Sequence, residues 1–465
     1  MPLPLPPEVP GLPLLGNTVA FARDRRKLIR EAYERFGPIF SLRFGPKKAV
    51  VLLGPEYNKF FFTETDKKLS MDKALEFQRA MYPGNVMFYA GVENYRDQRP
   101  IVAAPLQSAR MDSHVRVMQL EVDQWLNSLG DEGTFELVEH ATRLSQTVVS
   151  HAIMGREFRD HISGNWHLFP DLAGGLDPIL PHYLPLPKFI RRDRAKNKLT
   201  ELIGQILRKR QAEPGQHADF LQDFINARYR DGRQMPDDDI IGVIMAMMIA
   251  GYETTVGHVS WSLIQLLQNP DYLRLVLADQ DSLLDPKEPL ELGKLRQLNR
   301  LDWTLKETER LHPSVGILVR YALEDCEVGG YRIPKGWLAF VSPEISHRLP
   351  NVWSNPEQYD PLRFSPGREE DKTPMTMIGF GGGVHRCTGL HFAYNFTKVA
   401  LTRMLQRFDM ELVTREPRDL IGMQVSRPDA CVVRYKRRAA RTTPTEYPPE
   451  VIAACPHLRS QAGGN

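Results

Sequence analysis

The stretch Phe380-Gly-Gly-Gly-Val-His-Arg-Cys387-Thr-Gly389 decides how the whole chain is interpreted. Four glycines and one cysteine fall within ten positions, and an apolar helical pattern beginning at Leu390 follows at once. Glycines let the backbone turn tightly and approach a flat molecule closely. The start of the helix directs unpaired N–H groups and the positive end of its dipole at the cysteine sulfur. We expect these donors to lower the pKa of the Cys387 thiol and to hold it as a thiolate.

Two interpretations of Cys387 follow from this stretch alone. As a thiolate, its sulfur could be the proximal ligand of a haem iron, where its electron push favours cleavage of an O–O bond. Alternatively, Cys387 is a free cysteine buried beside a glycine turn, because free cysteine is among the most buried residue types. The rest of the chain has to distinguish the two.

The composition is that of an ordinary globular protein. Of the 465 residues, 42% are hydrophobic and 25% are charged, so the core can be large enough to enclose a sizeable cofactor. The net charge of +3 gives no basic field that would indicate a nucleic-acid partner. The four cysteines are far apart and form no C-x-x-C pair, which argues against a zinc site and a disulfide scaffold and fits a reducing compartment.

Neither a targeting segment nor a membrane span is predicted. Residues 1–20 form a proline-rich lead, and its prolines exclude the interior of a helix. The longest strongly apolar run, Ile240 to Ala250, is shorter than the ~20 residues that a spanning helix needs. We therefore expect a cytoplasmic, soluble protein, or one from which an anchor has been removed, with at most peripheral membrane contact.

Helices are predicted over most of the chain and strands over little of it. Helical patterns cover residues 24–36, several segments between 121 and 230, and 299–312, whereas 39–44, 49–53 and parts of 321–341 favour strands. Breaks are predicted near Pro83-Gly84 and at Pro100. Residues 170–187 predict an apolar loop that covers a cavity, touches a membrane surface or packs on its own core. We expect one domain over 21–438 and a poorly ordered polar tail over 439–465.

A long helix is predicted from Pro236 to Gln268. Proline and acidic residues form its start, and its first half is apolar nearly all round, so it should be buried through the centre of the domain. Small residues at Ala250 and Gly251 would let a flat molecule lie against it. Glu253 and Thr254 place an acid and a hydroxyl in this apolar helix, where they could deliver protons to dioxygen. Alternatively, the threonine only bends the helix and the glutamate faces the surface.

Two further motifs place an acid near two arginines. Glu307 and Arg310 are three residues apart on one predicted helix face and can pair. Such pairs are common and mostly superficial. The downstream element Pro356-Glu-Gln-Tyr-Asp-Pro-Leu-Arg363-Phe364 offers Glu307 a second arginine.

The order of these motifs resembles that of the cytochrome P450 superfamily of haem-thiolate monooxygenases. The motifs A-G-x-E-T-T, E-x-x-R, P-E-x-x-x-P-x-R-F and F-x-x-G-x-x-x-C-x-G follow one another as they do in that family. The resemblance covers nearly the whole chain and implies a mainly α fold with a small β part, in which the long central helix lies over the haem. By this resemblance the axial ligand of the iron of haem b is Cys387, the catalytic acid–alcohol pair is Glu253 and Thr254, and the structural triad that holds the cysteine loop is Glu307, Arg310 and Arg363.

Several segments are similar more specifically to the sterol 14α-demethylase branch. Most of the superfamily has arginine two residues before the cysteine, whereas this chain has His385, as that branch does. The segment Asp171-Leu-Ala-Gly-Gly175 is also similar to the branch. By this resemblance the residues expected at the haem are Arg99, Arg320 and His385, which would bind its propionates as charge-assisted contacts, together with Phe380.

Two positions depart from the pattern of that branch. It usually has histidine before the helix threonine, where this chain has Glu253, and a tyrosine near the position of Leu75. Two substrate classes therefore remain: a sterol that is demethylated at the 14α position, or another bulky apolar molecule, such as a different terpenoid or lipid, that is hydroxylated. The residues expected to line the substrate site are Leu75, Phe77, Phe88, Ala250 and Ile317.

The implied chemistry needs a partner protein. The chain has no room for a flavin or ferredoxin domain, so electrons would come from a separate ferredoxin or flavoprotein reductase that docks on the cysteine side of the haem. Two other classes stay open: a haem-thiolate enzyme that rearranges peroxides without a reductase, and a non-enzymatic haem sensor or carrier.

Overall fold

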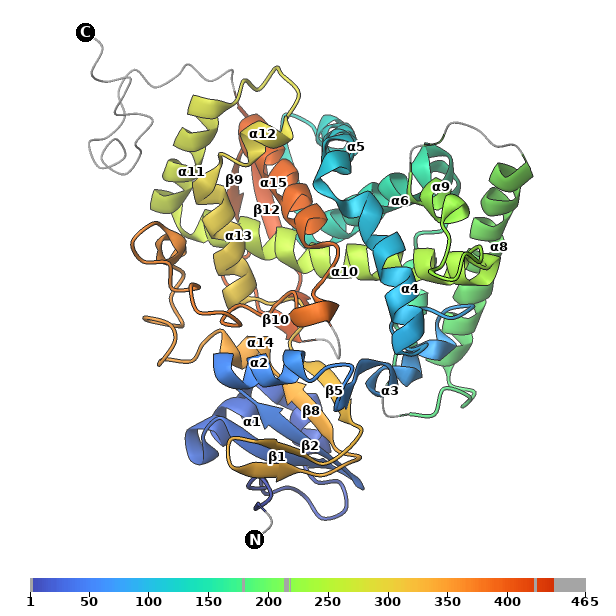
Figure 1. The fold of residues 1–465 in the computed structure, drawn as a ribbon. Coiled ribbons are helices and arrows are strands. Elements are labelled where there is room, and N and C mark those ends of the chain that lie inside the picture. The colour runs from blue at the N-terminus through green and yellow to red at the C-terminus, as the bar shows by residue number, and fades with distance from the viewer. Residues whose placement is uncertain (1–2, 178–179, 213–216, 218, 422–424, 439–465) are drawn as a thin grey trace.

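The computed structural model describes residues 3–177, 180–212, 217, 219–421 and 425–438. Helices make up most of this part of the chain, and a smaller β-rich part lies near the N-terminus (Figure 1). This agrees with the mainly α fold with a small β part that the sequence predicts. The tail expected over 439–465 lies outside the described residues.

The bounds of the elements are as follows. The α-helices are α1 (Thr18–Phe36), α2 (Pro55–Thr63), α3 (Met71–Ala74), α4 (Val92–Ala103), α5 (Ser108–Ser128), α6 (Leu137–Ile162), α7 (Leu168–Ala173), α8 (Pro187–Ala212), α9 (Phe220–Asn226), α10 (Asp237–Gln268), α11 (Pro270–Leu283), α12 (Leu292–Leu295), α13 (Asn299–Leu311), α14 (Pro343–Ser346) and α15 (Leu390–Arg407). Short 3-10 turns are η1 (Glu76–Ala80), η2 (Ala104–Leu106), η3 (Pro361–Phe364) and η4 (Gly383–His385). The strands are β1 (Ile39–Phe44), β2 (Lys47–Leu52), β3 (Leu69–Ser70), β4 (Glu132–Glu136), β5 (Leu318–Ala322), β6 (Cys326–Val328), β7 (Tyr331–Ile333), β8 (Leu338–Val341), β9 (Phe408–Leu412), β10 (Asp419–Ile421), β11 (Ser426–Pro428) and β12 (Val432–Arg437).

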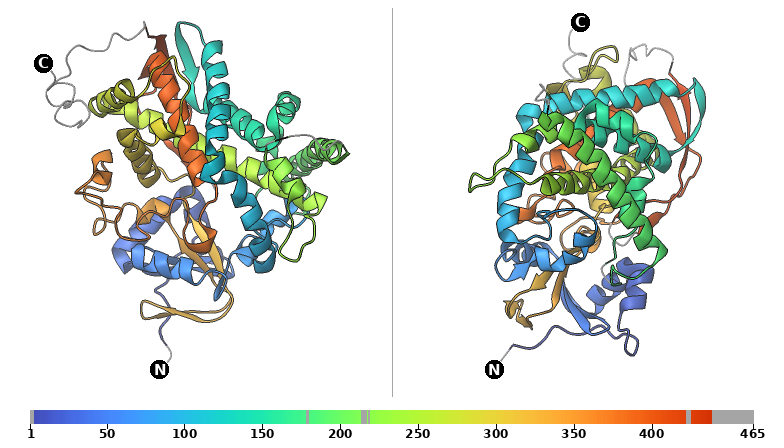
Figure 2. Two further views of the ribbon diagram at one scale, coloured as in Figure 1. Left: turned by 45° about the horizontal axis from the view of Figure 1, so that its top comes forward. Right: turned by 90° about the vertical axis from the view of Figure 1, so that its right-hand side faces the viewer.

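The long helix α10 runs through the middle of the helical part, as both further views confirm (Figures 1 and 2). It begins one residue after the predicted start and ends at the predicted residue. Pro236 precedes it, and aspartates fill its first turn, where they favour the positive end of the helix dipole. Its 32 residues correspond to about 48 Å. Helices α6, α8, α13 and α15 pack against it.

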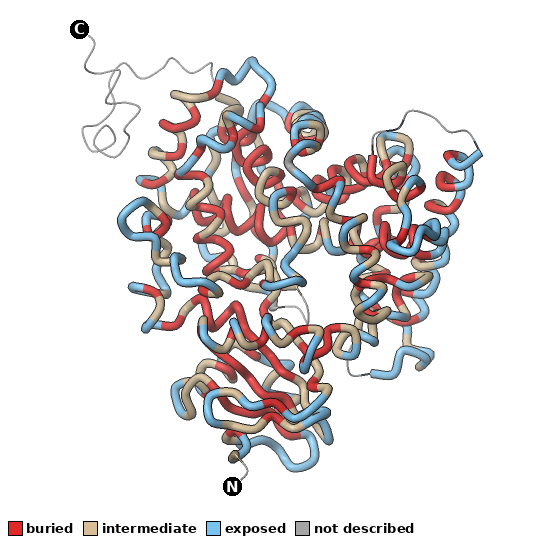
Figure 3. The backbone as a smooth tube through the Cα atoms, in the orientation of Figure 1, coloured by how far each residue is buried: buried red, intermediate tan, exposed pale blue. Residues whose placement is uncertain are grey.

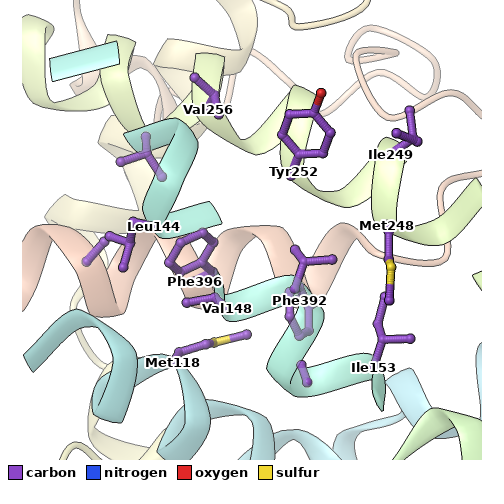
Figure 4. Close-up of a cluster of buried hydrophobic side chains, with 14 of the residues drawn as sticks. Met118, Leu144, Val148, Ile153, Met248, Ile249, Tyr252, Val256, Phe392 and Phe396 are labelled. Carbon is purple, nitrogen blue, oxygen red and sulfur yellow. The ribbon is translucent and has the colours of Figure 1, made fainter. Parts of the chain in front are cut away.

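The largest hydrophobic core surrounds α10. Figure 4 shows the part of this core in which side chains of α5, α6, α10 and α15 interdigitate. The labelled residues are Met118, Leu144, Val148, Ile153, Met248, Ile249, Tyr252, Val256, Phe392 and Phe396. Each is at least nine-tenths buried, so the apolar composition of α10 is explained by this packing.

Among the described residues, one helix is long and apolar enough to cross a membrane, and it is α10. The apolar run Ile240 to Ala250 is thus part of a longer apolar segment. However, 72% of the relevant window is buried inside the protein, so the helix has the burial of a core element.

A five-stranded sheet forms most of the described β-rich part. Its strand order is β1-β2-β8-β5-β3, with β2 and β8 parallel and the other neighbours antiparallel. The predicted β1–β2 hairpin is confirmed, with Ile39 opposite Leu52. Figure 3 shows long buried stretches along these strands. Strand β5 lies between β8 and β3 and carries Arg320 opposite Ala339 of β8.

Several predicted boundaries were wrong. Helix α1 begins at Thr18, before the predicted start, and Asp24 interrupts it with non-helical φ −160° and ψ 84°. Pro100 does not break α4 but lies inside it. The buried residues Tyr95 and Val102 anchor α4 on both sides of this proline, and their packing offsets a cost of about 3 kcal/mol. The sequence also gave no sign of β4, which exists because β12 pairs with it.

The segment before α4 lies directly on α10 at Gly242. A Cβ atom at Gly242 would overlap the Pro83 carbonyl oxygen and approach Val86 Cγ2 to 2.9 Å. We expect Gly242→Ala to destabilise the protein by about 1–3 kcal/mol, because overpacking outweighs the better helix propensity of alanine. Chemical denaturation measures this change. The matched control is Gly293→Ala in α12, where a Cβ meets open space and no loss is expected; equal stability of both variants would contradict the close contact.

Candidate active site

A fully buried carboxylate, Glu307, is shared by two fully buried arginines. Arg310 donates from Nε to Glu307 Oε2 at 2.7 Å and from Nη2 to Oε1 at 2.9 Å. Arg363 Nε lies 3.1 and 3.0 Å from the two carboxylate oxygens. The three side chains are 0% exposed. The structure therefore brings together the three residues that the resemblance implies as a triad, and their pairing is not superficial.

Most of the remaining donors of these arginines bind backbone carbonyls of one long segment, and Arg363 Nη1 also donates to Glu370 Oε2 at 2.8 Å. Arg310 donates to the carbonyls of His347, Pro356 and Gln358, at 3.0, 2.6 and 3.0 Å. Arg363 adds a bond to the Ser354 carbonyl at 2.9 Å. The triad thus fixes the irregular chain between α14 and η3, which leads towards the cysteine loop.

The cysteine loop folds tightly between α2 and α15. Gly381 and Gly383 have φ of +70° and +60°, which side chains other than glycine rarely adopt. A Cβ at Gly382 would stand 2.8 Å from the ring of Phe62, so the loop approaches α2 closely. The Cys387 N–H closes the loop by donating to the Phe380 carbonyl at 2.9 Å.

Cys387 is exposed, whereas the other described cysteines, Cys326 and Cys431, are buried. The interpretation of Cys387 as a buried free cysteine is therefore wrong. Desolvation by the surrounding protein nevertheless raises the pKa of its thiol, so the sulfur lies in a recess of the protein. The N–H groups of Gly389 and Leu390 act in the expected direction and lower the pKa, but they do not outweigh desolvation.

His385 lies in the cysteine loop, two residues before Cys387, and packs against Asp66 and Tyr95. Its Nε2 lies 2.7 Å from Asp66 Oδ2, and its ring contacts the Tyr95 ring with centroids 3.9 Å apart. Tyr95 donates its hydroxyl hydrogen to the Val384 carbonyl at 2.8 Å. The second ring nitrogen, Nδ1, is buried and has no hydrogen-bond partner among the described residues.

Two arginines gather at the same place. Arg99 Nη2 donates to the Arg386 carbonyl at 2.7 Å, and its guanidinium lies 5.6 Å from the centroid of the Tyr95 ring. Arg320 is buried and donates from Nε to Thr65 Oγ1 at 3.1 Å. Burial lowers the pKa of Arg320 to about 10. Within the described part of the chain, neither arginine forms an ion pair with a carboxylate.

This donor set fits the haem that the resemblance implies. A buried cation without an anionic partner is costly, and so is an unpaired buried nitrogen. The carboxylates of the haem propionates would satisfy Arg99, Arg320 and the free Nδ1 of His385. The exposed sulfur of Cys387, between glycines that allow close approach, would provide the soft ligand for the iron.

Residues in the middle of α10 are more exposed than most of the helix. Ala250 is exposed and Thr254 is half-buried, whereas their neighbours in the helix are largely buried. Gly251, however, meets Val149 of α6, so its small size serves helix packing and not an opening for a flat molecule. Thr254 donates its hydroxyl hydrogen to the Ala250 carbonyl at 2.7 Å, and Ser314 donates to the Thr254 carbonyl at 2.8 Å. The helix stays continuous across these bonds.

Glu253 is half-buried, and burial raises the pKa of its carboxyl above the ordinary value. The positive charge of Arg427 on β11 acts in the opposite direction. Glu253 in turn contributes to the raised pKa values of Tyr82 and Tyr252. The carboxyl therefore faces protein, and the alternative of a glutamate that simply faces the surface is not supported.

The residues expected to line the substrate site pack against different parts of the hydrophobic core. Leu75, Phe77, Phe88 and Ile317 are half-buried. Leu75 and Phe88 pack against the main core, whereas Ile317 packs against the cluster around α1 and the sheet. Their contact with a substrate stays a prediction.

Three residues of the site were missed in the sequence: Phe62, Asp66 and Tyr95. Phe62 and Asp66 lie far from the motifs along the chain and reach the loop only through the fold. Tyr95 carried a usable signal, because it lies four residues before Arg99 on α4 and therefore on the same helix face.

The sequence is similar to those of known proteins over nearly its whole length. Residues 6–430 match the family model described as Cytochrome P450. The chain is 33% identical over 447 residues to a sterol 14-demethylase of Arabidopsis thaliana, covering 93% of this chain and 92% of the relative. It is 32% identical to a sterol 14alpha-demethylase of Mycobacterium tuberculosis, covering 91% and 96%, and 29% identical to a lanosterol 14-alpha demethylase of Homo sapiens, covering 92% and 86%.

A solved structure has a similar fold. The retinoic acid-bound cyanobacterial CYP120A1 superposes with a TM-score of 0.86 at 27% sequence identity. The match covers 94% of this chain and 100% of that chain.

Because the triad is buried, removing the charge of Glu307 should lower the stability of the protein strongly. Glu307→Gln keeps the shape of the side chain but leaves the buried guanidinium of Arg310 without its carboxylate partner and that of Arg363 with Glu370 alone. We expect a loss of about 3–5 kcal/mol in the free energy of unfolding, measured by chemical denaturation. The control Glu31→Gln removes the carboxylate of an exposed pair with Lys27 and should change stability by no more than about 1 kcal/mol. Similar small effects in both variants would show that the triad is not structural.

Proposed function

The chain belongs to the cytochrome P450 family and is a haem-dependent monooxygenase, and we propose that it oxidises a sterol in a 14α-demethylation. The observation that carries the sterol proposal is the similarity, over nearly the whole chain, to sterol 14-demethylases of a plant and a bacterium. His385, which the sequence analysis associates with that branch, supports it. Family membership also decides against the non-enzymatic haem carrier that the sequence left open.

The alternative is hydroxylation of a different bulky apolar molecule, such as another terpenoid or lipid. Glu253 and Leu75 favour it, because both depart from the residues that the sterol branch usually has. The structural relative, at 27% identity, is described with retinoic acid and not with a sterol.

We assign the binding of haem b to the residues around the recess. The sulfur of Cys387 would hold the iron, and Arg99, Arg320 and the free Nδ1 of His385 would hold the propionates. Bound there, haem supplies the activation of dioxygen and the cleavage of its O–O bond. The thiol would be held as a thiolate when it coordinates the iron, because a metal ion deprotonates a coordinating thiol. The Gly389 and Leu390 N–H groups then stabilise the thiolate.

Proton delivery is assigned to the Glu253–Thr254 pair. The raised pKa of Glu253 keeps the carboxyl closer to its protonated form, so it can donate a proton more readily than an exposed glutamate. Thr254 donates its own hydrogen to the Ala250 carbonyl, which leaves its oxygen able to accept a second hydrogen bond. An acid next to such a hydroxyl can pass protons towards the open face at Ala250.

Enzymes of this family need a redox partner and bind apolar substrates. We propose a separate ferredoxin or flavoprotein reductase that donates electrons from the side of the Cys387 loop. We further propose a cytoplasmic location with at most peripheral membrane contact.

The ligand assignment is tested by the absorption spectrum of the reduced, carbon monoxide-bound protein. The unaltered protein should show the red-shifted Soret band of a thiolate-ligated haem, and Cys387→Ala should lack it. Cys431→Ala removes a buried cysteine and should retain the band. A normal band in Cys387→Ala would disprove the assignment.

Replacement of Thr254 tests proton delivery. We expect Thr254→Ala to reduce the product formed per electron pair consumed by about tenfold or more, since general acid catalysis contributes ~10²–10⁴-fold. Thr255 is a matched control, because its hydroxyl bonds the Gly251 carbonyl in the same way but the residue is buried. Thr255→Ala should keep the original coupling. Equal coupling in all three proteins would exclude the role proposed for Thr254.

The substrate is tested by titrating the haem-loaded protein with 14α-methyl sterols. A bound substrate that displaces water from the iron changes its spin state and therefore its Soret spectrum. Saturable changes with these sterols, followed by loss of the 14α-methyl group on turnover, are expected. If no 14α-methyl sterol produces a change while other terpenoids do, the alternative function is correct.

A further inference from the structure

A buried carboxyl–phenol pair lies behind the cysteine loop, and the chemistry described above does not use it. Tyr394 on α15 donates its hydroxyl hydrogen to Glu309 Oε2 on α13 at 2.7 Å. Glu309 is only 7% exposed. Among the described residues no lysine or arginine lies within ion-pair distance of it, in contrast to Glu307 on the same helix. A carboxyl group in this position is costly unless it serves a purpose.

The pair contacts the residues at which the loop begins. The Gly379 N–H donates to Glu309. A Cβ at Gly379 would stand 2.7 Å from Glu309 Oε1, so only glycine fits against the carboxyl. The Tyr394 ring contacts the Phe380 ring, with centroids 5.6 Å apart. The Phe380 carbonyl accepts the Cys387 N–H. A shift of Gly379 or Phe380 would therefore also move Cys387.

A negative charge on Glu309 affects the pKa of the Cys387 thiol. Desolvation is the main cause of the raised pKa of Cys387, and negative charge on Glu309 acts in the same direction with a smaller effect. Burial raises the pKa of Glu309 to about 7, against the opposing effects of the Tyr394 hydroxyl, Arg386 and Lys306. Glu309 therefore changes its charge near neutral pH.

The two histidines and the tyrosine around this pair do not change charge in that range. Lys306 is paired with Asp371 at 2.9 Å. His258 of α10 contacts the Tyr394 ring, and burial lowers its pKa to about 4. His347 accepts the Ile378 N–H at 2.8 Å, and burial lowers its pKa to about 3. Burial also raises the pKa of Tyr394 well above its ordinary value.

We propose that Glu309 is a positioning residue of the Cys387 loop whose change of charge makes the reduction potential of the haem iron depend on pH. The proposal rests on Cys387 being the iron ligand. One electron from the external donor reduces the iron and adds negative charge near Glu309. The carboxylate then takes up one proton from water, so one electron and one proton enter together.

The direction in which the reduction potential changes with pH follows from this linked uptake of an electron and a proton. The reduced state favours the protonated carboxyl, so the pKa of Glu309 is higher in the reduced than in the oxidised protein. Between those two pKa values, reduction requires a proton, and the potential falls as pH rises. Below both values and above both values the potential is insensitive to this group. We expect the fall to be centred near neutral pH.

The test is a spectroelectrochemical titration of the haem-loaded protein from pH 5 to pH 9. The unaltered protein should show the fall in potential, and Glu309→Gln should flatten it, because the amide oxygen still accepts from Tyr394 but carries no charge. Tyr394→Phe removes a donor that stabilises the carboxylate, so it should move the fall to higher pH. The control Glu31→Gln, far from the loop in sequence and exposed, should reproduce the unaltered curve.

The outcomes separate this proposal from the ligand assignment. The carbon monoxide spectrum of each variant is recorded first. A missing thiolate-type band in the unaltered protein means that Cys387 is not the ligand. A normal band with the same pH dependence in Glu309→Gln and the unaltered protein, or with no dependence in the latter, overturns the role of Glu309. If Glu309→Gln does not fold, the direction of the shift in Tyr394→Phe decides: a shift to lower pH or no shift overturns the proposal.

Discussion

The sharing of one buried carboxylate by two buried arginines is the constraint on which the rest of the site depends. Burial of the Glu307 carboxylate is costly unless Arg310 and Arg363 compensate it, and both buried arginines pair with Glu307, with Glu370 as a second partner of Arg363. Once the three are together, the unused donors of the arginines bind backbone carbonyls of the segment between α14 and η3. A stretch with little regular structure is thereby given one conformation, and the chain then continues through η3 and residues 365–379 to the cysteine loop.

Around that fixed frame, the site combines features that would each be unfavourable in a closed core. Arg320 is buried without a carboxylate partner, Nδ1 of His385 has no partner among the described residues, and Ala250 opens the middle of a buried helix. Haem bound as proposed would relieve all three, because its propionates would supply negative charge and its ring would cover apolar surface.

Much of the fold could be predicted because the signals are local. The bounds of α10 follow from a proline and acidic start, an apolar body and an Asn-Pro end, and they were predicted to within one residue. The family, the P450 fold, the haem cofactor and the monooxygenase class are confirmed by the comparisons. Strand β4 and the continuation of α4 through Pro100 could not be predicted, since pairing with β12 and packing of buried neighbours decide them. The pKa of Cys387 was predicted with the wrong sign, because desolvation is a property of the surrounding fold.

By itself, the sequence determined the order of the motifs, the chemical type of each group and the length of the central helix. These properties depend on residue identity and spacing within single segments. Only the tertiary structure decided that Glu307 is buried and not superficial, that Cys387 is exposed in a recess, and which residues join them. Asp66 and Tyr95 reach His385 across more than 280 positions of sequence. Burial, desolvation and such distant contacts arise from how segments pack, and no local pattern encodes them.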